Sequence, residues 1–124
     1  MDVINPTHIA KPGPGYAQGT KAGGMVFVAG QVAIDANGQI VGKGDIVAQT
    51  RQTLANVLAI VEAGGLTLVD VVSTTVYIKD YSDYKRFAET WVAVFGSHTP
   101  VRATIKADLV HPDLLIEVQA IAAV

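Results

Sequence analysis

The spacing of apolar residues changes along the chain and separates strands from helices. Ala17–Ala22 and Met25–Val32 have the length of short strands, and between them stands Gly23-Gly24, a pair typical of a two-residue hairpin turn. A second turn signal, Asp35–Gly38, leads into the short segment Gln39–Val41. We therefore expect a β-hairpin followed by a third, short strand in the first third of the chain.

The residues before this hairpin are rich in turn-forming types. Residues 1–19 hold three of the five prolines, together with Gly13, Gly15 and Gly19. Proline fixes φ, and glycine permits values of φ that other residues avoid. This composition predicts an irregular arm that bends sharply before Tyr16.

From Asp45 onwards the apolar residues recur with the period of a helix. They form one stripe made up of Ile46, Val47, Thr50, Leu54, Val57, Leu58 and Val61. Asp45 suits the N-cap of this helix, and Gly64-Gly65 suits its C-terminal end. Four polar residues lie off the stripe: Gln49, Arg51, Gln52 and Asn56. The pattern predicts a helix with one apolar face and one polar face.

A strand and a second helix follow. Val69–Lys79 is rich in β-branched and aromatic residues, which predicts a strand. The helix after it is capped by Asp80 or Ser82. Its apolar residues stand at helical spacing: Tyr84, Phe87, Trp91, Val94 and Phe95.

The last quarter of the chain has the pattern of two strands. Pro100 marks a new start, and the strands Val101–Leu109 and Leu114–Val124 flank a turn at His111–Asp113. Taken together, the elements predict a single domain over residues 1–124. We expect an α+β sandwich in which two helices cover one face of a mixed β-sheet.

The composition points to contacts between subunits. Half of the 124 residues are hydrophobic, but only 16% are charged, compared with about 25% in an ordinary globular domain. A small domain has too much surface to bury such an excess alone, so we expect part of it to lie at subunit contacts. The alternative is an unusually apolar monomer rich in alanine and valine.

Charge and cysteine content narrow the range of partners. Nine Lys and Arg residues are scattered and outnumbered by eleven Asp and Glu residues, so no basic stripe for nucleic acid is expected. The absence of cysteine excludes disulfides, thiolate zinc sites and cysteine nucleophiles. The apolar runs Met25–Ala29 and Val71–Ile78 are far shorter than the ~20 residues that a membrane helix needs. We expect a soluble, cytoplasmic protein that binds neither nucleic acid nor a membrane.

The sequence carries no motif for the common cofactor or hydrolase chemistries. It has no phosphate-binding glycine loop, no dinucleotide-binding glycine motif and no GxSxG. His8, His98 and His111 are isolated from one another, so we expect no metal site. The candidates for chemistry are therefore polar residues inside otherwise apolar strands.

Arg102 and Glu117 are the two strand residues of this kind. Glu117 either faces solvent or a subunit rim, or is a desolvated carboxyl with a raised pKa that can exchange a proton near neutrality. Arg102 either forms a surface salt bridge or grips a small carboxylate through two parallel hydrogen bonds. Arg102 is also the nearest opposing charge expected for Glu117. Tyr16 either packs against the fold or forms a pocket wall that carries one hydroxyl.

Five blocks of sequence are specific in combination. They occur in the order Gly13–Gly19, Val26–Val32, Gln49–Val57, Pro100–Thr104 and Ile116–Ala122. From Ala10 to the last residue the chain thereby resembles the Rid family (YjgF/RidA, the reactive intermediate deaminases). Val41–Asp45 and Leu109–Asp113 are similar to the members associated with aminoacrylate in pyrimidine breakdown.

The resemblance implies a fold, an assembly and an activity. The family has a chorismate-mutase-like fold, forms homotrimers with active sites between subunits, and hydrolyses enamines and imines such as 2-aminoacrylate to 2-keto acids and ammonia. It uses no metal or organic cofactor. By position, Arg102 matches the arginine that binds the substrate carboxylate, and Glu117 matches the glutamate that positions the attacking water. Tyr16 matches a pocket-wall tyrosine, the backbone N–H of Thr104 supports the same carboxylate, and Gly30 lines the cleft.

Three residues depart from the usual family pattern. Ala29 stands where serine is common, Ala88 where asparagine is common, and Thr104 where cysteine is frequent. These changes remove polar contacts and make room, so a ring-cleavage deaminase acting on a longer substrate such as 2-aminomuconate is one alternative. Another is a non-catalytic ligand-binding or interaction module, which would not require Arg102 and Glu117 together.

Overall fold

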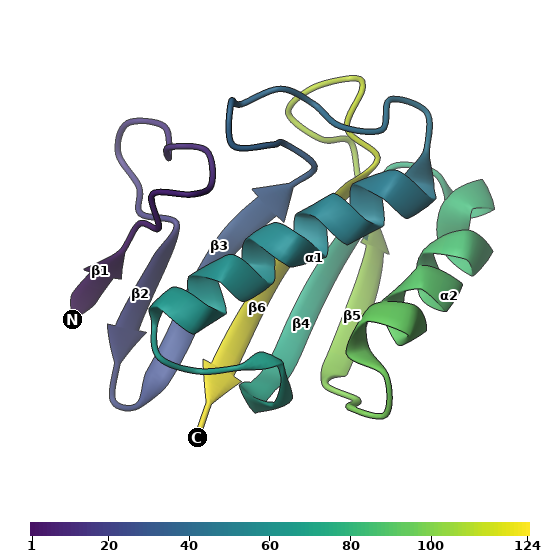
Figure 1. The fold of residues 1–124 in the computed structure, drawn as a ribbon. Coiled ribbons are helices and arrows are strands. Elements are labelled where there is room, and N and C mark those ends of the chain that lie inside the picture. Colours follow the sequence, from purple (N-terminus) through teal and green to yellow (C-terminus); the bar gives the residue numbers. More distant parts are fainter.

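One six-stranded sheet carries two helices on the same face in the computed structural model of this protein, which describes all of residues 1–124 (Figure 1). The strands are β1 (Asp2–Ile4), β2 (Gly19–Ala22), β3 (Met25–Val32), β4 (Val71–Ile78), β5 (Val101–Lys106) and β6 (Ile116–Ala123). The helices are α1 (Ile46–Ala63) and α2 (Tyr84–Phe95), and the short 3₁₀ helices η1 (Leu68–Asp70) and η2 (Tyr81–Asp83) precede β4 and α2. The expected α+β architecture is confirmed.

The order of the strands places the end of the chain in the middle of the sheet. This order is β1-β2-β3-β6-β4-β5, so β6 lies between two strands that are far apart in the sequence. β4 and β5 run parallel, with α2 in the connection between them, and the other neighbouring strands are antiparallel. The sheet is therefore mixed, and residues of β6 lie beside residues of both β3 and β4.

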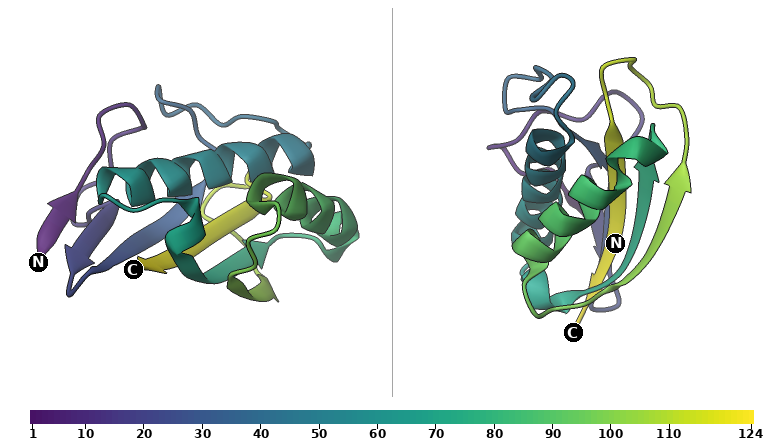
Figure 2. Two further views of the ribbon diagram at one scale, coloured as in Figure 1. Left: turned by 60° about the horizontal axis from the view of Figure 1, so that its bottom comes forward. Right: turned by 90° about the vertical axis from the view of Figure 1, so that its right-hand side faces the viewer.

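The hydrophobic core fills the layer between the sheet and the two helices (Figure 2). Val76 and Val118 of the sheet, and Leu54 and Phe87 of the helices, are fully buried there. Burying one such side chain contributes roughly 1.5–3 kcal/mol to stability. Neither helix has the length and hydrophobicity that crossing a lipid bilayer requires.

The hairpin turn and the cap of α1 that the sequence predicts are present. Gly23 and Gly24 have φ values of 58° and 75°, and this positive pair forms the tight turn between β2 and β3. At the start of α1, the Asp45 carboxylate accepts a hydrogen bond from the N–H of Ala48 at 3.1 Å. These contacts are local in the sequence, which is why the pattern alone indicated them.

The cap predicted for the second helix is wrong. Asp80 caps the short helix η2 by accepting a hydrogen bond from the N–H of Ser82 at 2.8 Å, and α2 begins after Asp83, which makes no side-chain cap bond.

Two predictions about the N-terminal third are wrong. The arm contains a strand, because β1 pairs with β2 over its whole length. Gln39–Val41 is not a strand, and a single bridge joins Ile34 to Ile40. Gly38 and Gly42 flank the segment with φ values of 77° and 68°, and this left-handed backbone turns the chain away at both ends.

The last two strands are shorter than the sequence predicts. β5 ends at Lys106 and β6 begins at Ile116, so the connection between them spans residues 107–115. After β5, the N–H of Ala107 still donates to the carbonyl of Ile78 at 3.0 Å, and pairing with β4 ends there. The longer connection leads directly into the segment that carries Glu117.

The polar face predicted for α1 is wrong at two positions. Gln49 and Asn56 are buried, with exposed fractions of 0% and 4%. The Gln49 amide donates to the carbonyl of Asp113 at 2.8 Å, and its carbonyl accepts from the N–H of Leu115 at 2.8 Å. Asn56 donates to the carbonyl of Val32 at 3.1 Å. Because backbone groups satisfy both amides, these polar side chains can lie beneath the loops that they hold.

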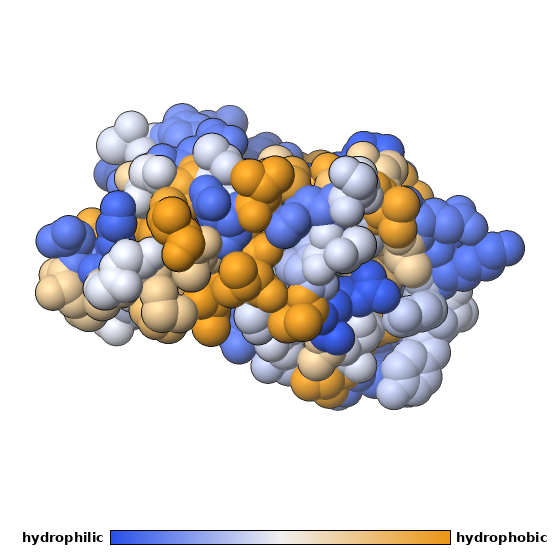
Figure 3. Space-filling model, turned by 90° about the horizontal axis from the view of Figure 1, so that it is seen from below, coloured by the Kyte–Doolittle hydropathy of each residue, from blue (hydrophilic) through white to orange (hydrophobic).

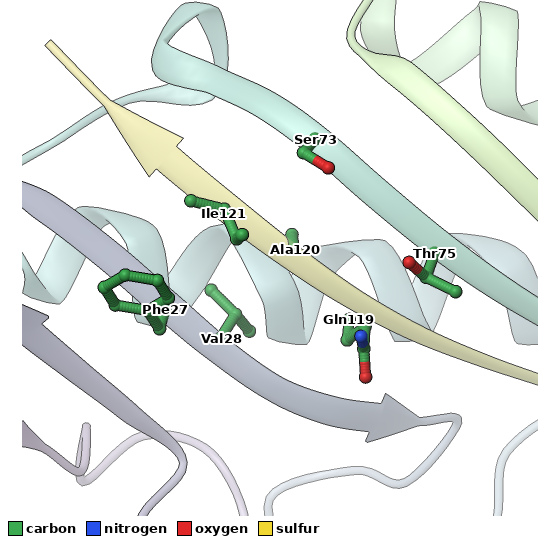
Figure 4. A pocket seen from close by; sticks show the side chains of 7 residues that line it. All are labelled: Phe27, Val28, Ser73, Thr75, Gln119, Ala120 and Ile121. Atoms are coloured by element: carbon green, nitrogen blue, oxygen red, sulfur yellow. The ribbon is translucent and has the colours of Figure 1, made fainter.

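The face of the sheet opposite the helices is uncovered. A shallow hollow crosses its centre (Figure 4), lined by Phe27 and Val28 of β3, Ser73 and Thr75 of β4, and Gln119, Ala120 and Ile121 of β6. The lining mixes aromatic and aliphatic side chains with two hydroxyls and one amide. A sheet face of this composition is neither a closed core nor a fully polar surface.

Candidate active site

The two strand residues singled out above face opposite sides of the sheet. Arg102 pairs with the buried Thr74 of β4, and its guanidinium lies against α2 on the helix side. Glu117 stands between Ile116 and Val118, which are buried beneath the helices. Because side chains alternate along a strand, Glu117 points to the uncovered face.

Arg102 and Glu117 are also displaced from each other along the strand direction. Arg102 is in register with Thr74, whereas Glu117 is in register with Tyr77, three residues further along β4. Three residues of strand correspond to roughly 10 Å, and two strand spacings across the sheet add about as much again. The expectation that Arg102 supplies the opposing charge for Glu117 is therefore wrong within one chain.

Glu117 lies directly beneath Gly30. A Cβ atom at Gly30 would stand 3.0 Å from the carboxyl carbon of Glu117 and closer still to one of its oxygens. Only a residue without a side chain leaves this space to the carboxylate. The structure thus brings together Gly30 and Glu117, two of the residues that the resemblance assigns to the cleft.

A β-bulge creates this contact. The pairing of β3 with β6 shifts between Val28 and Gln31, so Ala29 and Gly30 oppose a single residue of β6, Gln119. Bulges bend a strand and redirect its side chains, and they recur beside active sites. Here the bulge brings the backbone of β3 over the Glu117 side chain.

Burial raises the pKa of the Glu117 carboxyl. Desolvation penalises the charged form, and no charged partner offsets it, because none of the three ion pairs in the structure includes Glu117. The carboxyl is half-buried between Tyr77 and the loop at residues 107–110. A carboxyl in this setting can take up and release a proton closer to neutral pH than an exposed glutamate does.

The Arg102 guanidinium packs on aromatic rings and has no acidic partner. Its central carbon lies 5.1 Å from the ring centre of Phe87 and 5.3 Å from that of Trp91, within the range of cation–π attraction. One terminal nitrogen donates to the hydroxyl of Tyr84 at 3.0 Å. The surface salt bridge considered for Arg102 does not form, since none of the three ion pairs includes it.

Thr104 lies on the same side of β5 as Arg102. β5 is an edge strand, and the N–H of Ala107 points inwards to β4. Because N–H directions alternate along a strand, the N–H of Thr104 points to the free edge. Arg102 and this N–H together offer hydrogen-bond donors at one edge of the sheet, which is the arrangement an anion requires.

Tyr16 is joined to the Gly30 segment only through a hydrogen bond between neighbouring residues. It lies in the loop between β1 and β2, and two residues later the carbonyl of Gln18 accepts a hydrogen bond from the N–H of Ala29 at 2.9 Å. The Tyr16 ring is 58% exposed and packs against Gly13. The candidate residues thus form two groups, Gly30 and Glu117 on the open face and Arg102 and Thr104 on the helix side, and Tyr16 lies in the loop before β2.

The sequence did not indicate that aromatic residues of α2 contact the Arg102 guanidinium. The spacing of Tyr84, Phe87 and Trp91 predicts the apolar face of a helix, and Phe87 and Trp91 do belong to the core. A pattern of this kind cannot show that a cation from strand β5 covers the same rings.

No group of three or more histidine, aspartate or glutamate side chains is placed to hold a metal ion.

The fold and the site define a class of small α+β proteins in which a mixed sheet carries an arginine at its edge and a half-buried glutamate on its open face. The sequence profile of the family described as Endoribonuclease L-PSP matches residues 8–124. The chain belongs to this family, which is the Rid family of YjgF and RutC proteins.

Relatives and solved structures cover nearly the whole chain. A RutC family protein of Pyrococcus horikoshii is 44% identical over 122 residues, 98% of this chain and 96% of its own length. The 2-iminobutanoate/2-iminopropanoate deaminase of Salmonella typhimurium is 42% identical over 110 residues, 86% of this chain and 85% of its own. The crystal structure of the YjgF gene product of E. coli, 35% identical, matches with a TM-score of 0.92 and covers 99% of this chain and 98% of its own.

Proposed function

We propose that this protein is a hydrolytic deaminase that converts small enamine and imine acids of the 2-aminoacrylate type to 2-keto acids and ammonia. The observation that carries the proposal is that one fold presents both an arginine that lacks any acidic partner and a glutamate whose pKa burial raises. The Salmonella relative, a 2-iminobutanoate/2-iminopropanoate deaminase, supports it, because both compounds that it is named for carry a carboxylate next to the imine.

The proposed reaction needs orientation and proton transfer more than a strong nucleophile. The imine carbon is already electrophilic, and Arg102 would hold the neighbouring carboxylate so that this carbon faces a water molecule. Glu117 would accept a proton from the water as its oxygen bonds to the imine carbon. The same proton then passes to nitrogen and gives a carbinolamine. The proton of its new hydroxyl moves to nitrogen in turn, the carbon–nitrogen bond breaks as the carbonyl forms, and ammonia leaves a 2-keto acid. An enamine first takes a proton on carbon and loses one from nitrogen, and thereby becomes the imine.

We propose that the reaction uses no cofactor. Hydrolysis of an imine involves no net oxidation or reduction, and the leaving group is ammonia, which two proton transfers from the added water release. The side chains in the two groups supply the carboxylate anchor and the proton carrier that these steps require.

The opposite orientations of Arg102 and Glu117 support an active site shared between subunits. One chain cannot bring both to a small substrate, whereas two copies can place the β5 edge of one beside the open face of the other. We propose a homotrimer in which each site takes Arg102 and Thr104 from one subunit and Tyr16, Gly30 and Glu117 from its neighbour.

Apolar surface outside the core supports this assembly. Val69, Val72 and Val101 are exposed. Figure 3 shows apolar residues gathered on the end of the molecule where β4 and β5 begin and β6 ends. We propose that this surface and the open sheet face bury part of the excess of apolar residues at subunit contacts.

Light scattering on the purified protein is expected to give about three times the mass of one chain, as for a closed cyclic trimer. The measured mass should stay constant on dilution through the micromolar range. A monomer at all concentrations would contradict both the trimer and the shared site.

A mixing experiment tests the shared site directly. Chains carrying Arg102→Ala and chains carrying Glu117→Gln, each inactive alone, are unfolded and refolded together in equal amounts. Each site needs an intact Arg102 and an intact Glu117 from two subunits, and half of the chains supply each, so about a quarter of the wild-type activity should return. No recovery in demonstrably mixed trimers would contradict a site built from two chains.

The activity itself is tested on 2-aminoacrylate generated in the cuvette, with the appearance of pyruvate followed by a coupled dehydrogenase. The protein is first dialysed against a chelator. Pyruvate should appear faster than by uncatalysed hydrolysis, in proportion to the protein added. An unchanged rate at high protein concentration would reject the proposal, and a rate restored only by added metal would reject its cofactor-free form.

We propose no nucleic-acid partner, although the family description names an endoribonuclease. The nine basic residues are outnumbered by eleven acidic ones, and the net charge is −2. Phosphate backbones are bound by clustered basic side chains. The chain has no run of basic residues longer than Lys85-Arg86.

A further inference from the structure

The guanidinium of Arg102 is held from two directions by residues of α2. Below it lie the rings of Phe87 and Trp91, with their centres 5.1 and 5.3 Å from its central carbon. At one side the hydroxyl of Tyr84 accepts a hydrogen bond from a terminal nitrogen at 3.0 Å. The Tyr84 ring is itself 5.9 Å from the guanidinium carbon.

These three rings form a row of contacts along α2. Tyr84 and Phe87 have ring centres 5.8 Å apart, and Phe87 and Trp91 have ring centres 5.6 Å apart. Phe87 and Trp91 are buried, with exposed fractions of 0% and 5%. Tyr84 is 42% exposed and packs on this buried pair, and its hydroxyl projects from the start of α2.

The two kinds of contact constrain different motions of the guanidinium. Stacking on the rings fixes its plane, but a flat cation can still rotate within that plane over an apolar surface. A hydrogen bond to one terminal nitrogen stops this rotation. The guanidinium has five N–H donors, and the bond to Tyr84 takes one, so the opposite edge keeps the parallel pair that a carboxylate binds.

We propose that Tyr84 is a positioning residue that orients Arg102 for the substrate carboxylate, and that Trp91 beneath the guanidinium reports carboxylate binding by its fluorescence. This inference rests on the proposed function, in which Arg102 is the carboxylate anchor. Tyr84 acts only through Arg102 and takes no part in proton transfer.

The fluorescence signal follows from the composition of the chain. Trp91 is the only tryptophan, so all indole emission comes from the ring that packs against Arg102. The positive charge over an indole affects its excited state, and a carboxylate that neutralises this charge changes the emission. Binding at Arg102 is thus observable without a label and without turnover.

The experiment titrates the wild-type protein and two variants with pyruvate, a 2-keto acid of the product class, and records Trp91 emission. Tyr84→Phe removes the hydroxyl and keeps the ring. Tyr81→Phe is the matched control, because Tyr81 stands three residues earlier and its ring lies 5.6 Å from the Lys106 ammonium instead.

Tyr84→Phe is expected to weaken pyruvate binding by about three- to tenfold and to raise KM by the same factor, with kcat within about twofold of the wild type. Tyr81→Phe should leave the pyruvate affinity, KM and kcat unchanged. A merely structural role for Tyr84 would lower kcat and thermal stability without this selective loss of carboxylate affinity. Unchanged pyruvate affinity in Tyr84→Phe would overturn the inference.

Arg102→Lys separates this inference from the proposed function. If this variant loses both pyruvate binding and the fluorescence response while Tyr84→Phe binds normally, Arg102 is the anchor and only the role of Tyr84 is wrong. If Arg102→Lys binds pyruvate as well as the wild type, the anchor itself is wrong, and the proposed function fails with it.

Discussion

Replacing Glu117 by glutamine is expected to lower kcat for imine hydrolysis by roughly 10²–10⁴-fold, the usual contribution of a positioned acid–base group. Glutamine keeps the size of the side chain and one hydrogen-bond acceptor, and it fits beneath Gly30 as glutamate does. It cannot carry a proton from water to the leaving nitrogen. The protein should stay folded and trimeric and should still bind pyruvate, because Arg102 is unchanged.

The matched control for this variant is Glu89→Gln, which removes the same charge from an exposed position on α2. Its kcat should equal that of the wild type. Unchanged turnover in Glu117→Gln would reject the role of Glu117 as proton carrier. Loss of pyruvate affinity would show instead that Glu117 acts by placing the carboxylate-binding group of the neighbouring subunit.

The raised pKa of Glu117 gives a pH dependence of definite sign. The ionised carboxylate is the form that accepts a proton from water, so kcat should fall as the pH drops through this raised pKa, at higher pH than for an ordinary glutamate.

The raised pKa also means that Glu117 binds its proton more tightly in the folded protein than in the unfolded chain. The stability that protonated Glu117 contributes is therefore fully present below the pKa of the unfolded chain and is lost as the pH rises through the pKa of the folded protein. Glu117→Gln should abolish that loss.

Replacing Arg102 by lysine is expected to lower kcat/KM by roughly 10- to 1000-fold, which corresponds to the loss of one or two charge-assisted hydrogen bonds. Lysine keeps the charge but has neither the planar fork that holds a carboxylate in one orientation nor the flat surface that stacks on Phe87 and Trp91. The effect should appear with every carboxylate-bearing imine. Circular dichroism and light scattering should show an unchanged fold and assembly.

Arg86→Lys is the control for this change. Arg86 is exposed on α2 and its guanidinium lies 3.8 Å from the Asp83 carboxylate, so it forms a surface ion pair of the kind that lysine replaces well. Its kinetics should match the wild type. If Arg102→Lys also shows wild-type kinetics, Arg102 is an ordinary surface cation and does not anchor the substrate carboxylate.

The amino-acid sequence determined the elements whose contacts are local. The helix from Asp45 to Gly64 follows from a cap, an apolar period and a terminal glycine within one segment, and the Gly23-Gly24 turn follows from two adjacent residues. The motif residues Arg102 and Glu117 could be singled out because charged side chains stand out in apolar strands. Each of these signals is contained in a short stretch of chain.

Features that depend on distant segments could not be read in this way. β1 forms because β2 offers it an edge; Val3 and Ile4 favour a strand, but a three-residue segment is too short to predict one by itself. Gln49 and Asn56 have polar side chains at positions off the apolar stripe of α1. Their burial depends on carbonyl groups of loops up to 64 residues away, which satisfy the amides only after the chain has folded.

Only the tertiary structure decided how the candidate residues are arranged. The sequence places Arg102 and Glu117 on neighbouring strand segments and indicates that each is chemically useful. The sheet order inserts β6 between β3 and β4 and leaves β5 at the edge, so strand alternation turns one side chain towards α2 and the other towards the open face. The side of a sheet that a residue faces depends on strand register, and register is fixed by hydrogen bonds and packing between distant segments.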